Sequence, residues 1–164
     1  MNDHAPETTE ILAFPRRASV EDLPDVAKIY RLAFFTAMPQ MPVLHSPAED
    51  LNYFLTGVYV SSELWVLEAP GGVSVGFIAF RPGWVDHLYV VPKYQRHGLG
   101  SSLLSVAMAS SATLRARTFR CNWGGRHFFE KYGFRMEGET DGRGNEEKQP
   151  DVLYVWERNA GAKQ

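Results

Sequence analysis

Two glycines lie between a predicted strand and a predicted helix, in a segment whose chemistry suits a phosphate group. Residues 91–102 read Val-Pro-Lys-Tyr-Gln-Arg-His-Gly-Leu-Gly-Ser-Ser, with Gly98 and Gly100 where the helix begins. The first turn of a helix has unpaired N–H groups and a partial positive charge, so it stabilises an anion. Glycine tolerates positive φ and leaves the backbone open to phosphate oxygens. The segment therefore predicts a loop that binds a diphosphate.

Two better-known phosphate loops do not fit this segment. A P-loop has a lysine after its second glycine, whereas Gly100 is followed by Ser101 and Ser102. A dinucleotide fingerprint needs a third glycine, which does not follow. Residues 95–100, Gln-Arg-His-Gly-Leu-Gly, instead resemble motif A of the GNAT superfamily of acyl-CoA-dependent N-acyltransferases, (Gln/Arg)-x-x-Gly-x-(Gly/Ala).

Two further segments resemble the same family, in the right order. Residues 84–92, Trp-Val-Asp-His-Leu-Tyr-Val-Val-Pro, are similar to its fourth strand. Residues 122–134, Asn-Trp-Gly-Gly-Arg-His-Phe-Phe-Glu-Lys-Tyr-Gly-Phe, resemble its motif B. The resemblance covers residues 16–158. It implies an α+β fold: a central mixed, mostly antiparallel twisted sheet of six to seven strands, helices on both faces, and strands four and five splayed apart.

The resemblance implies acetyl-CoA as cosubstrate. In the family, the pantetheine arm inserts between the splayed strands and bonds to strand-four backbone, here residues 88–90. Asn122 heads motif B, where its amide either contacts the cofactor, orders the splayed strands, or caps a helix. The implied cofactor-binding residues are Leu88, Tyr89, Val90, Gln95, Arg96, His97, Gly98, Leu99, Gly100, Ser101, Asn122 and Phe129.

Acyl transfer to an amine requires the neutral amine, and an alkylamine has a pKa of roughly 10, so a general base helps. The family often places a glutamate where this chain has Trp84. Regular strand alternation would put Trp84, Asp86 and Leu88 on one face. Asp86 is therefore the first candidate base, acting directly or through water, and His87 the second. The alternative for Asp86 is an ion pair with a neighbouring strand.

The usual general acid of the family is a tyrosine of motif B, and this chain has Phe129 at that position. Phenylalanine cannot donate a proton. Tyr132, one turn later, could replace it, solvent could protonate the leaving group, or the protein could bind acyl-CoA without turnover. We favour solvent, because a thiol of pKa roughly 8.5 leaves readily as thiolate. Cys121 is better explained as a small buried apolar residue than as a nucleophile.

The resemblance implies transfer of an acetyl group to a primary amine of a small molecule or peptide. The alternative function is an acyl-CoA-binding sensor or subunit with little or no turnover. The acidic segment 141–151 either favours a cationic acceptor or is an ordinary solvated turn. The residues that could line an acceptor pocket are Phe35, His45, Trp84 and Trp123.

Composition bounds the remaining possibilities. The chain has 164 residues and a net charge of −2 without a basic run, which argues against nucleic acid as a partner. No metal-ligand spacing and no run of eighteen apolar residues occurs, so we expect neither a metal nor a membrane span. The polar start is unlike a signal peptide, which predicts a cytoplasmic protein. We expect one N-acetyltransferase domain over residues 14–158, between flexible ends at 1–13 and 159–164.

Hydrophobic periodicity predicts the elements that must position these residues. Helices are expected from about residue 20 to 34, from 46 to 58 with Leu51, Phe54, Leu55 and Val58 on one face, and onward from residue 99. A short helix should end at Gly133. Strands are expected at 64–68, 74–80, 84–91, 114–121, 134–138 and 152–157. The apolar residues 152–156 offer a candidate surface for a homodimer, which is the family's habit.

Overall fold

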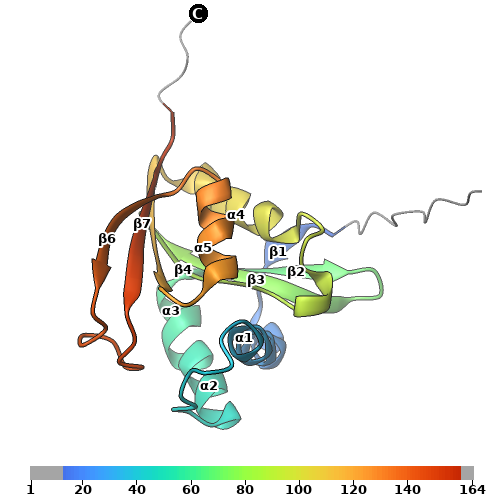
Figure 1. Cartoon of the computed structure of the whole chain (residues 1–164). Helices are drawn as coiled ribbons and strands as arrows, with labels where there is room; N and C mark the ends of the chain where they lie inside the picture. Colours follow the sequence, from blue (N-terminus) through green and yellow to red (C-terminus); the bar gives the residue numbers. More distant parts are fainter. Residues whose placement is uncertain (1–12, 160–164) are drawn as a thin grey trace, which may run out of the picture.

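A seven-stranded mixed sheet organises residues 13–159, the part of the chain that the computed structural model describes (Figure 1). The strand order is β1-β2-β3-β4-β5-β7-β6, and every neighbouring pair is antiparallel except β4 and β5. The strands are β1 (Pro15–Arg17), β2 (Glu63–Ala69), β3 (Val73–Arg81), β4 (Trp84–Val90), β5 (Thr113–Phe119), β6 (Arg135–Thr140) and β7 (Asp151–Glu157). The predicted loose ends, 1–13 and 159–164, fall almost wholly outside the described residues.

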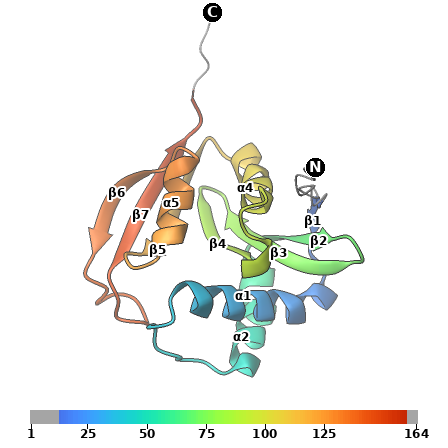
Figure 2. The same cartoon turned by 45° about the vertical axis from the view of Figure 1, so that its right-hand side comes forward.

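Helices cover both faces of this sheet, as expected (Figure 2). The helical segments are η1 (Val20–Asp22), α1 (Leu23–Ala37), α2 (Pro47–Tyr53), the π-helical turn η2 (Phe54–Val58), α3 (Tyr59–Ser61), η3 (Pro92–Tyr94), α4 (Leu99–Ser110) and α5 (Trp123–Lys131). Helix α2 starts at a capping box: Ser46 Oγ accepts from the Glu49 N–H at 3.2 Å, with proline in the first turn. None of the described helices is long and apolar enough to cross a membrane.

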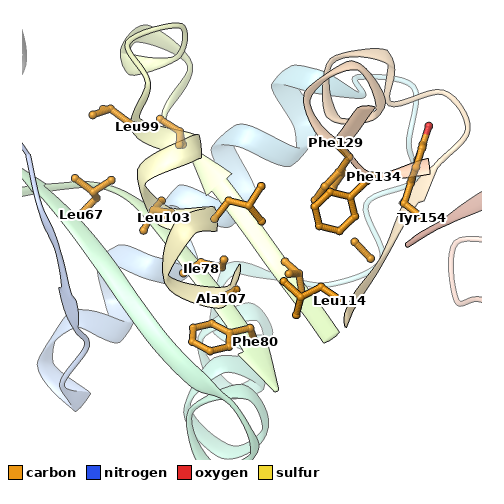
Figure 3. Packing of buried hydrophobic residues seen from close by; sticks show 14 of the residues in the cluster. Leu67, Ile78, Phe80, Leu99, Leu103, Ala107, Leu114, Phe129, Phe134 and Tyr154 are labelled. Carbon is orange, nitrogen blue, oxygen red and sulfur yellow. The ribbon is translucent and has the colours of Figure 1, made fainter. Parts of the chain in front are cut away.

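Two apolar layers hold these helices against the sheet. Helices α4 and α5 bury Leu103 and Phe129 on one face together with Ile78 and Phe80 of β3 (Figure 3). On the other face, α1 and η2 pack against Phe77 and other residues of β2 and β3. Residues 75–80 are all buried because both faces of β3 are covered.

Strands β4 and β5 separate almost at once. Their parallel ladder contains two residue pairs, Trp84 with Arg115 and Val85 with Ala116. Beyond Val85, β4 stays paired with β3 up to Val90, while β5 stays paired with β7 up to Phe119. This is the predicted splay, and it leaves one edge of β4 open within the described chain.

Two sequence expectations differ from the observed fold, and one strand was not predicted. Strand β1 was not predicted, since three residues carry too little pattern. Leu55 is 43% exposed, because the wider π turn of η2 displaces it from the predicted buried face. The dimer surface proposed at residues 152–156 is wrong: β7 lies between β5 and β6, and Val152, Tyr154 and Val155 are at most 2% exposed.

Candidate functional site

The glycine loop opens α4 with a left-handed turn. Gly98 is the N-cap of α4 and has φ +75°, a conformation that side chains rarely adopt. A Cβ added to Gly98 would meet nothing within 4 Å, so the space beside its backbone is open. In the first backbone hydrogen bond of α4, the Ser102 N–H donates to the Gly98 carbonyl at 3.1 Å. The N–H groups of residues 99–101 precede this bond and form the electropositive end of the helix.

Neighbouring residues of the loop have structural roles of their own. A Cβ on Gly100 would lie 3.0 Å from Cε2 of Phe128, so this glycine lets α4 approach α5. This is a packing reason, whereas the sequence suggested access to phosphate. Gln95 Nε2 donates to the Val90 carbonyl at 2.9 Å and ties the loop to the end of β4. Arg96 has φ 66°, so the loop holds two left-handed residues, Arg96 and Gly98.

The open edge of β4 carries Leu88, Tyr89 and Val90. On β3 they pair with Ile78, Phe77 and Gly76, in that order. On the other side, none of the three β4 residues has a partner in the described β4–β5 ladder. Their side chains pack into the two apolar layers, with Leu88 and Val90 on the α4 face and Tyr89 on the α1 face. The backbone groups on the β5 side of these three residues are unpaired within the described ladder, which is the arrangement that the predicted backbone binding would need.

A bulge interrupts β4 at Asp86. Ala79 pairs with His87 and Phe80 with Val85, so Asp86 is the extra residue. The bulge breaks the regular alternation: Val85 and Leu88 both contact the α4-side core. The expectation that Trp84, Asp86 and Leu88 share one face is therefore wrong.

Both carboxylate oxygens of Asp86 accept hydrogen bonds from Arg81 on β3. Arg81 Nε lies 2.7 Å from Oδ2, and Nη2 lies 2.9 Å from Oδ1. This is the ion pair with a neighbouring strand that the sequence left as an alternative. Arg81 and Trp84 face each other across a two-residue hairpin loop, so hairpin pairing could have indicated the contact.

His87 lies among aromatic rings from α1, α2 and β4. Its Nε2 is 2.9 Å from the hydroxyl of Tyr53, and its ring packs edge-on against Tyr30 with centroids 5.8 Å apart. Burial lowers the pKa of His87 to about 4, although the charge of Asp86 opposes the shift. The imidazole is therefore neutral at physiological pH.

A cavity of about 480 Å³ brings several of these groups together. Its polar lining combines the predicted residues Asp86 and His87 with Tyr53, Arg81 and Arg117, and Trp84 forms part of the wall. Sequence reasoning missed Tyr53 and Arg117, which come from distant elements and belong to no motif. Within residues 13–159, no cluster of three or more His, Cys, Asp or Glu side chains could hold a metal.

Residues of α5 lie outside this cavity lining. Asn122 caps the helix, since its Oδ1 accepts from the Gly125 N–H at 3.0 Å while its Nδ2 donates to Thr118 Oγ1 at 3.2 Å. Phe129 is 8% exposed and belongs to the core. Tyr132 packs on Phe128, with ring centroids 4.9 Å apart.

The other candidate aromatic residues and Cys121 contact neighbouring side chains. Trp123 is 72% exposed, and Arg126 stacks on its ring at 4.9 Å. Phe35 packs against Phe34, with centroids 5.0 Å apart. Cys121 packs against the cluster around Phe34, in line with its interpretation as an apolar residue.

The β6–β7 loop, residues 141–150, closes against the segment before α2. His45 Nε2 lies 2.7 Å from Glu146 Oε1 of this loop, and His45 Nδ1 lies 3.3 Å from Glu49 Oε2. The loop is fixed internally by Asn145, whose Nδ2 donates to the Gln149 carbonyl at 2.7 Å. The acidic loop that the sequence singled out is thus an ordered structure joined to the α1–α2 segment.

Comparisons with known proteins agree with this geometry. The family model described as Acetyltransferase (GNAT) domain matches residues 60–136, which include β2 to β5, α4 and α5. A probable N-acetyltransferase of Mycobacterium tuberculosis is 35% identical over 86 residues, 47% of this chain and 49% of the relative. These comparisons support membership of the GNAT superfamily. It spans about half the length of the curated relatives it matches.

Solved structures share the GNAT fold over most of the chain. Apo YjaB of Escherichia coli gives a TM-score of 0.75 at 18% identity, covering 89% of this chain and 98% of YjaB. The structure of yncA from Salmonella typhimurium, solved with its cofactor acetyl-CoA, gives a TM-score of 0.68 at 18% identity, covering 93% of this chain and 98% of yncA. These likenesses show that the overall fold is shared.

The contact between His45 and Glu146 should depend on pH. Hydrogen bonds to Glu49 and Glu146 raise the pKa of His45 above its ordinary value of 6.5. A raised pKa means that the charged contact is complete below pH 6.5 and is lost as pH rises through the folded-state value. We expect an NMR titration midpoint of His45 above 6.5, which Glu146→Gln lowers. A midpoint at or below 6.5 that Glu146→Gln leaves unchanged would contradict the contact.

Proposed function

We propose that this GNAT chain transfers the acetyl group of acetyl-CoA directly to a primary amine of a small molecule or peptide. The observation that carries the proposal is the open edge of β4, which leads through Gln95 into the loop before α4. An extended pantetheine arm can bond to this edge as an added strand would. The diphosphate then reaches the N–H groups at residues 99–101 and the open space beside Gly98.

The proposed cofactor contacts divide into two kinds. Leu88, Tyr89 and Val90 would contribute backbone groups, and the loop residues 95–101 would hold the diphosphate. Asn122 and Phe129 have weaker support as cofactor contacts, because Asn122 caps α5 and Phe129 lies in the core. The acetyl-CoA bound to yncA supports the choice of cosubstrate.

For proton transfer we propose His87 before Asp86. The two oxygens of Asp86 are engaged by Arg81, which makes Asp86 a positioning residue for the bulge. His87 is neutral above pH about 4 and lines the cavity together with Tyr53. The amine nitrogen bonds to the thioester carbonyl carbon and gives its proton to the imidazole. The C–S bond breaks, its electron pair leaves with sulfur, and solvent protonates the thiolate.

Release of free thiol tests the activity. We expect acetyl-CoA with a panel of amines to yield thiol, measured with a thiol-reactive chromophore, and the acetylated amine, measured by mass spectrometry. Acetyl-CoA without amine is the control. Acetyl-CoA binding without thiol release from any amine would contradict the activity and support the acyl-CoA sensor, which the phenylalanine at position 129 favours. A homodimer stays a prediction, and a monomer by light scattering at micromolar concentration would contradict it.

A further inference from the structure

The cavity that contains His87 carries more positive than negative charge. Its lining includes two arginines, Arg81 and Arg117, and one carboxylate, that of Asp86. His87 adds no charge at physiological pH, because burial lowers the pKa of its imidazole to about 4. The side chains that would touch a ligand therefore hold one cation that no carboxylate of the lining balances.

Arg117 stands where β4 and β5 separate. The last pair of their ladder joins Val85 to Ala116, so Arg117 is the first β5 residue beyond it, as Asp86 is the first of β4. Leu114 and Ala116 are buried in the α4-side core, and strand alternation sends Arg117 to the opposite face, where it lines the cavity. Arg117 thus enters the cavity at the point where the open edge of β4 begins.

Arg81 is already occupied within the cavity. Its Nε and Nη2 donate to the two carboxylate oxygens of Asp86, at 2.7 Å and 2.9 Å. This two-point contact uses the paired donors that a guanidinium would otherwise present to a ligand carboxylate. The charge of Arg81 is also balanced by Asp86. An anionic ligand is therefore expected at Arg117.

Arg117 has donors to spare. Its ion-pair partner among residues 13–159 is Asp151, whose Oδ1 lies 3.4 Å from Nη1. Asp151 already accepts shorter hydrogen bonds from Thr140 Oγ1 at 3.0 Å and from Asn145 Nδ2 at 3.1 Å, and it is 9% exposed. Nε and Nη2 of Arg117 have no hydrogen-bond partner within the described chain, and its side chain is half exposed. Asp151 therefore leaves most of this guanidinium free for a second carboxylate.

We propose that Arg117 binds a carboxylate of the acceptor while the amine of the same molecule faces His87, so that the acceptor is an aminocarboxylate. The parallel N–H groups of a guanidinium match the two oxygens of a carboxylate. A monoanion also balances the single excess charge of the lining. The cavity volume of about 480 Å³ lies within the range of roughly 300–1,000 Å³ found for small-molecule sites. The inference rests on the proposed function and names its substrate class.

The acidic β6–β7 loop does not change this preference. The sequence left open whether residues 141–151 favour a cationic acceptor, but none of them belongs to the described lining of the cavity. Within this loop, Glu146 contacts His45. The side chains in contact with a ligand decide the charge that is bound, and here they favour an anion.

Matched acceptors test this inference. We compare ω-aminocarboxylates from glycine to 6-aminohexanoate with the n-alkylamine and the diaminoalkane of the same carbon number. Thiol release by the wild-type chain should give the best aminocarboxylate a KM about tenfold below that of its alkylamine, as expected for one charge-assisted contact. The matching diamine should be the poorest of the three. A diamine with the lowest KM, or aminocarboxylates that nowhere surpass their alkylamines, would overturn the inference.

Substitution of Arg117 makes the test specific. Arg117→Gln should shift the KM ratio of the aminocarboxylate to its alkylamine about tenfold toward the alkylamine. A half-exposed ion pair adds little to stability, so this variant should fold. Arg135→Gln is the matched control, because Arg135 lies on β6, two strands from β5, with Nη2 3.5 Å from Glu157 Oε2. It should keep the wild-type ratio, whereas an unchanged ratio in Arg117→Gln would overturn the proposed role.

Calorimetry separates this inference from the proposed activity. Titration of the same aminocarboxylates into the chain saturated with coenzyme A should give binding that Arg117→Gln weakens about tenfold. Such binding without thiol release from any amine would support the carboxylate site while refuting acetyl transfer. Thiol release from amines without binding that depends on Arg117 would refute the carboxylate site and leave acetyl transfer supported.

Discussion

Gly98→Val should abolish the thermal stabilisation that acetyl-CoA gives the wild-type chain. A ligand at about 100 times its Kd stabilises the folded state by about 2.7 kcal/mol. Valine at φ +75° strains the loop, and its side chain fills the open space beside the backbone where we place the diphosphate. We expect affinity to fall at least about 100-fold, which removes most of this stabilisation at the same ligand concentration. The measurement is the melting temperature with and without acetyl-CoA.

Gly71→Val is the matched control for this experiment. Gly71 has φ +96° with nothing within 4 Å of an added Cβ, and it lies in the β2–β3 turn. Its substitution brings a similar backbone strain, of about 1–3 kcal/mol, without approaching the loop before α4. The apo melting temperatures of the two variants should therefore fall together while only Gly98→Val loses the ligand shift. Normal acetyl-CoA binding by Gly98→Val would refute the diphosphate assignment.

The sequence predicts features that depend on neighbouring residues, such as the glycine loop before α4. It does not predict features that depend on pairing between distant strands. The turn at Gly98 and the cap at Asn122 depend on neighbouring residues, so the sequence indicated both. The bulge at Asp86 depends on how β4 pairs with β3, and an assumption of regular alternation misplaced that side chain. Residues 152–157 were correctly predicted as a strand, but the sequence does not show that β7 inserts between β5 and β6.

The candidate site likewise combines residues that a local motif indicates with residues that only the fold brings together. Asp86 and His87 were found because they stand in a recognisable strand before the motif A loop. Tyr53 and Arg117 belong to no motif, and they line the same cavity only because the fold brings α2 and β5 close to the start of β4. Single-sequence reasoning gives the acidity of the β6–β7 loop but not the contact of its Glu146 with His45.

His87→Gln should lower kcat by about 10² to 10⁴, the range typical of losing an acid–base group, while acetyl-CoA affinity stays near the wild-type value. Glutamine keeps a hydrogen-bonding group near Tyr53 but cannot take up a proton. Asp86→Asn should cost less than about tenfold, because it weakens an ion pair with an arginine that is itself 45% exposed. Tyr132→Phe should have almost no effect, since its ring packs on Phe128 and its hydroxyl has no hydrogen-bond partner within residues 13–159.

The three variants separate the possible proton pathways when kcat is measured by thiol release at saturating amine. A large loss of kcat in Asp86→Asn, with an unchanged kcat in His87→Gln, would identify Asp86 as the base. Arg81, which binds both oxygens of Asp86, would then have to move during turnover. A large loss in Tyr132→Phe alone would mean that this phenol protonates the departing sulfur in place of the hydroxyl missing at Phe129. Solvent can protonate a thiolate of pKa roughly 8.5 near neutral pH, so the position of Phe129 in the core need not impair turnover. The amine proton becomes acidic only as the neutral nitrogen bonds to the carbonyl carbon, and His87 is the neutral group proposed to accept it then, so the largest loss is expected at His87.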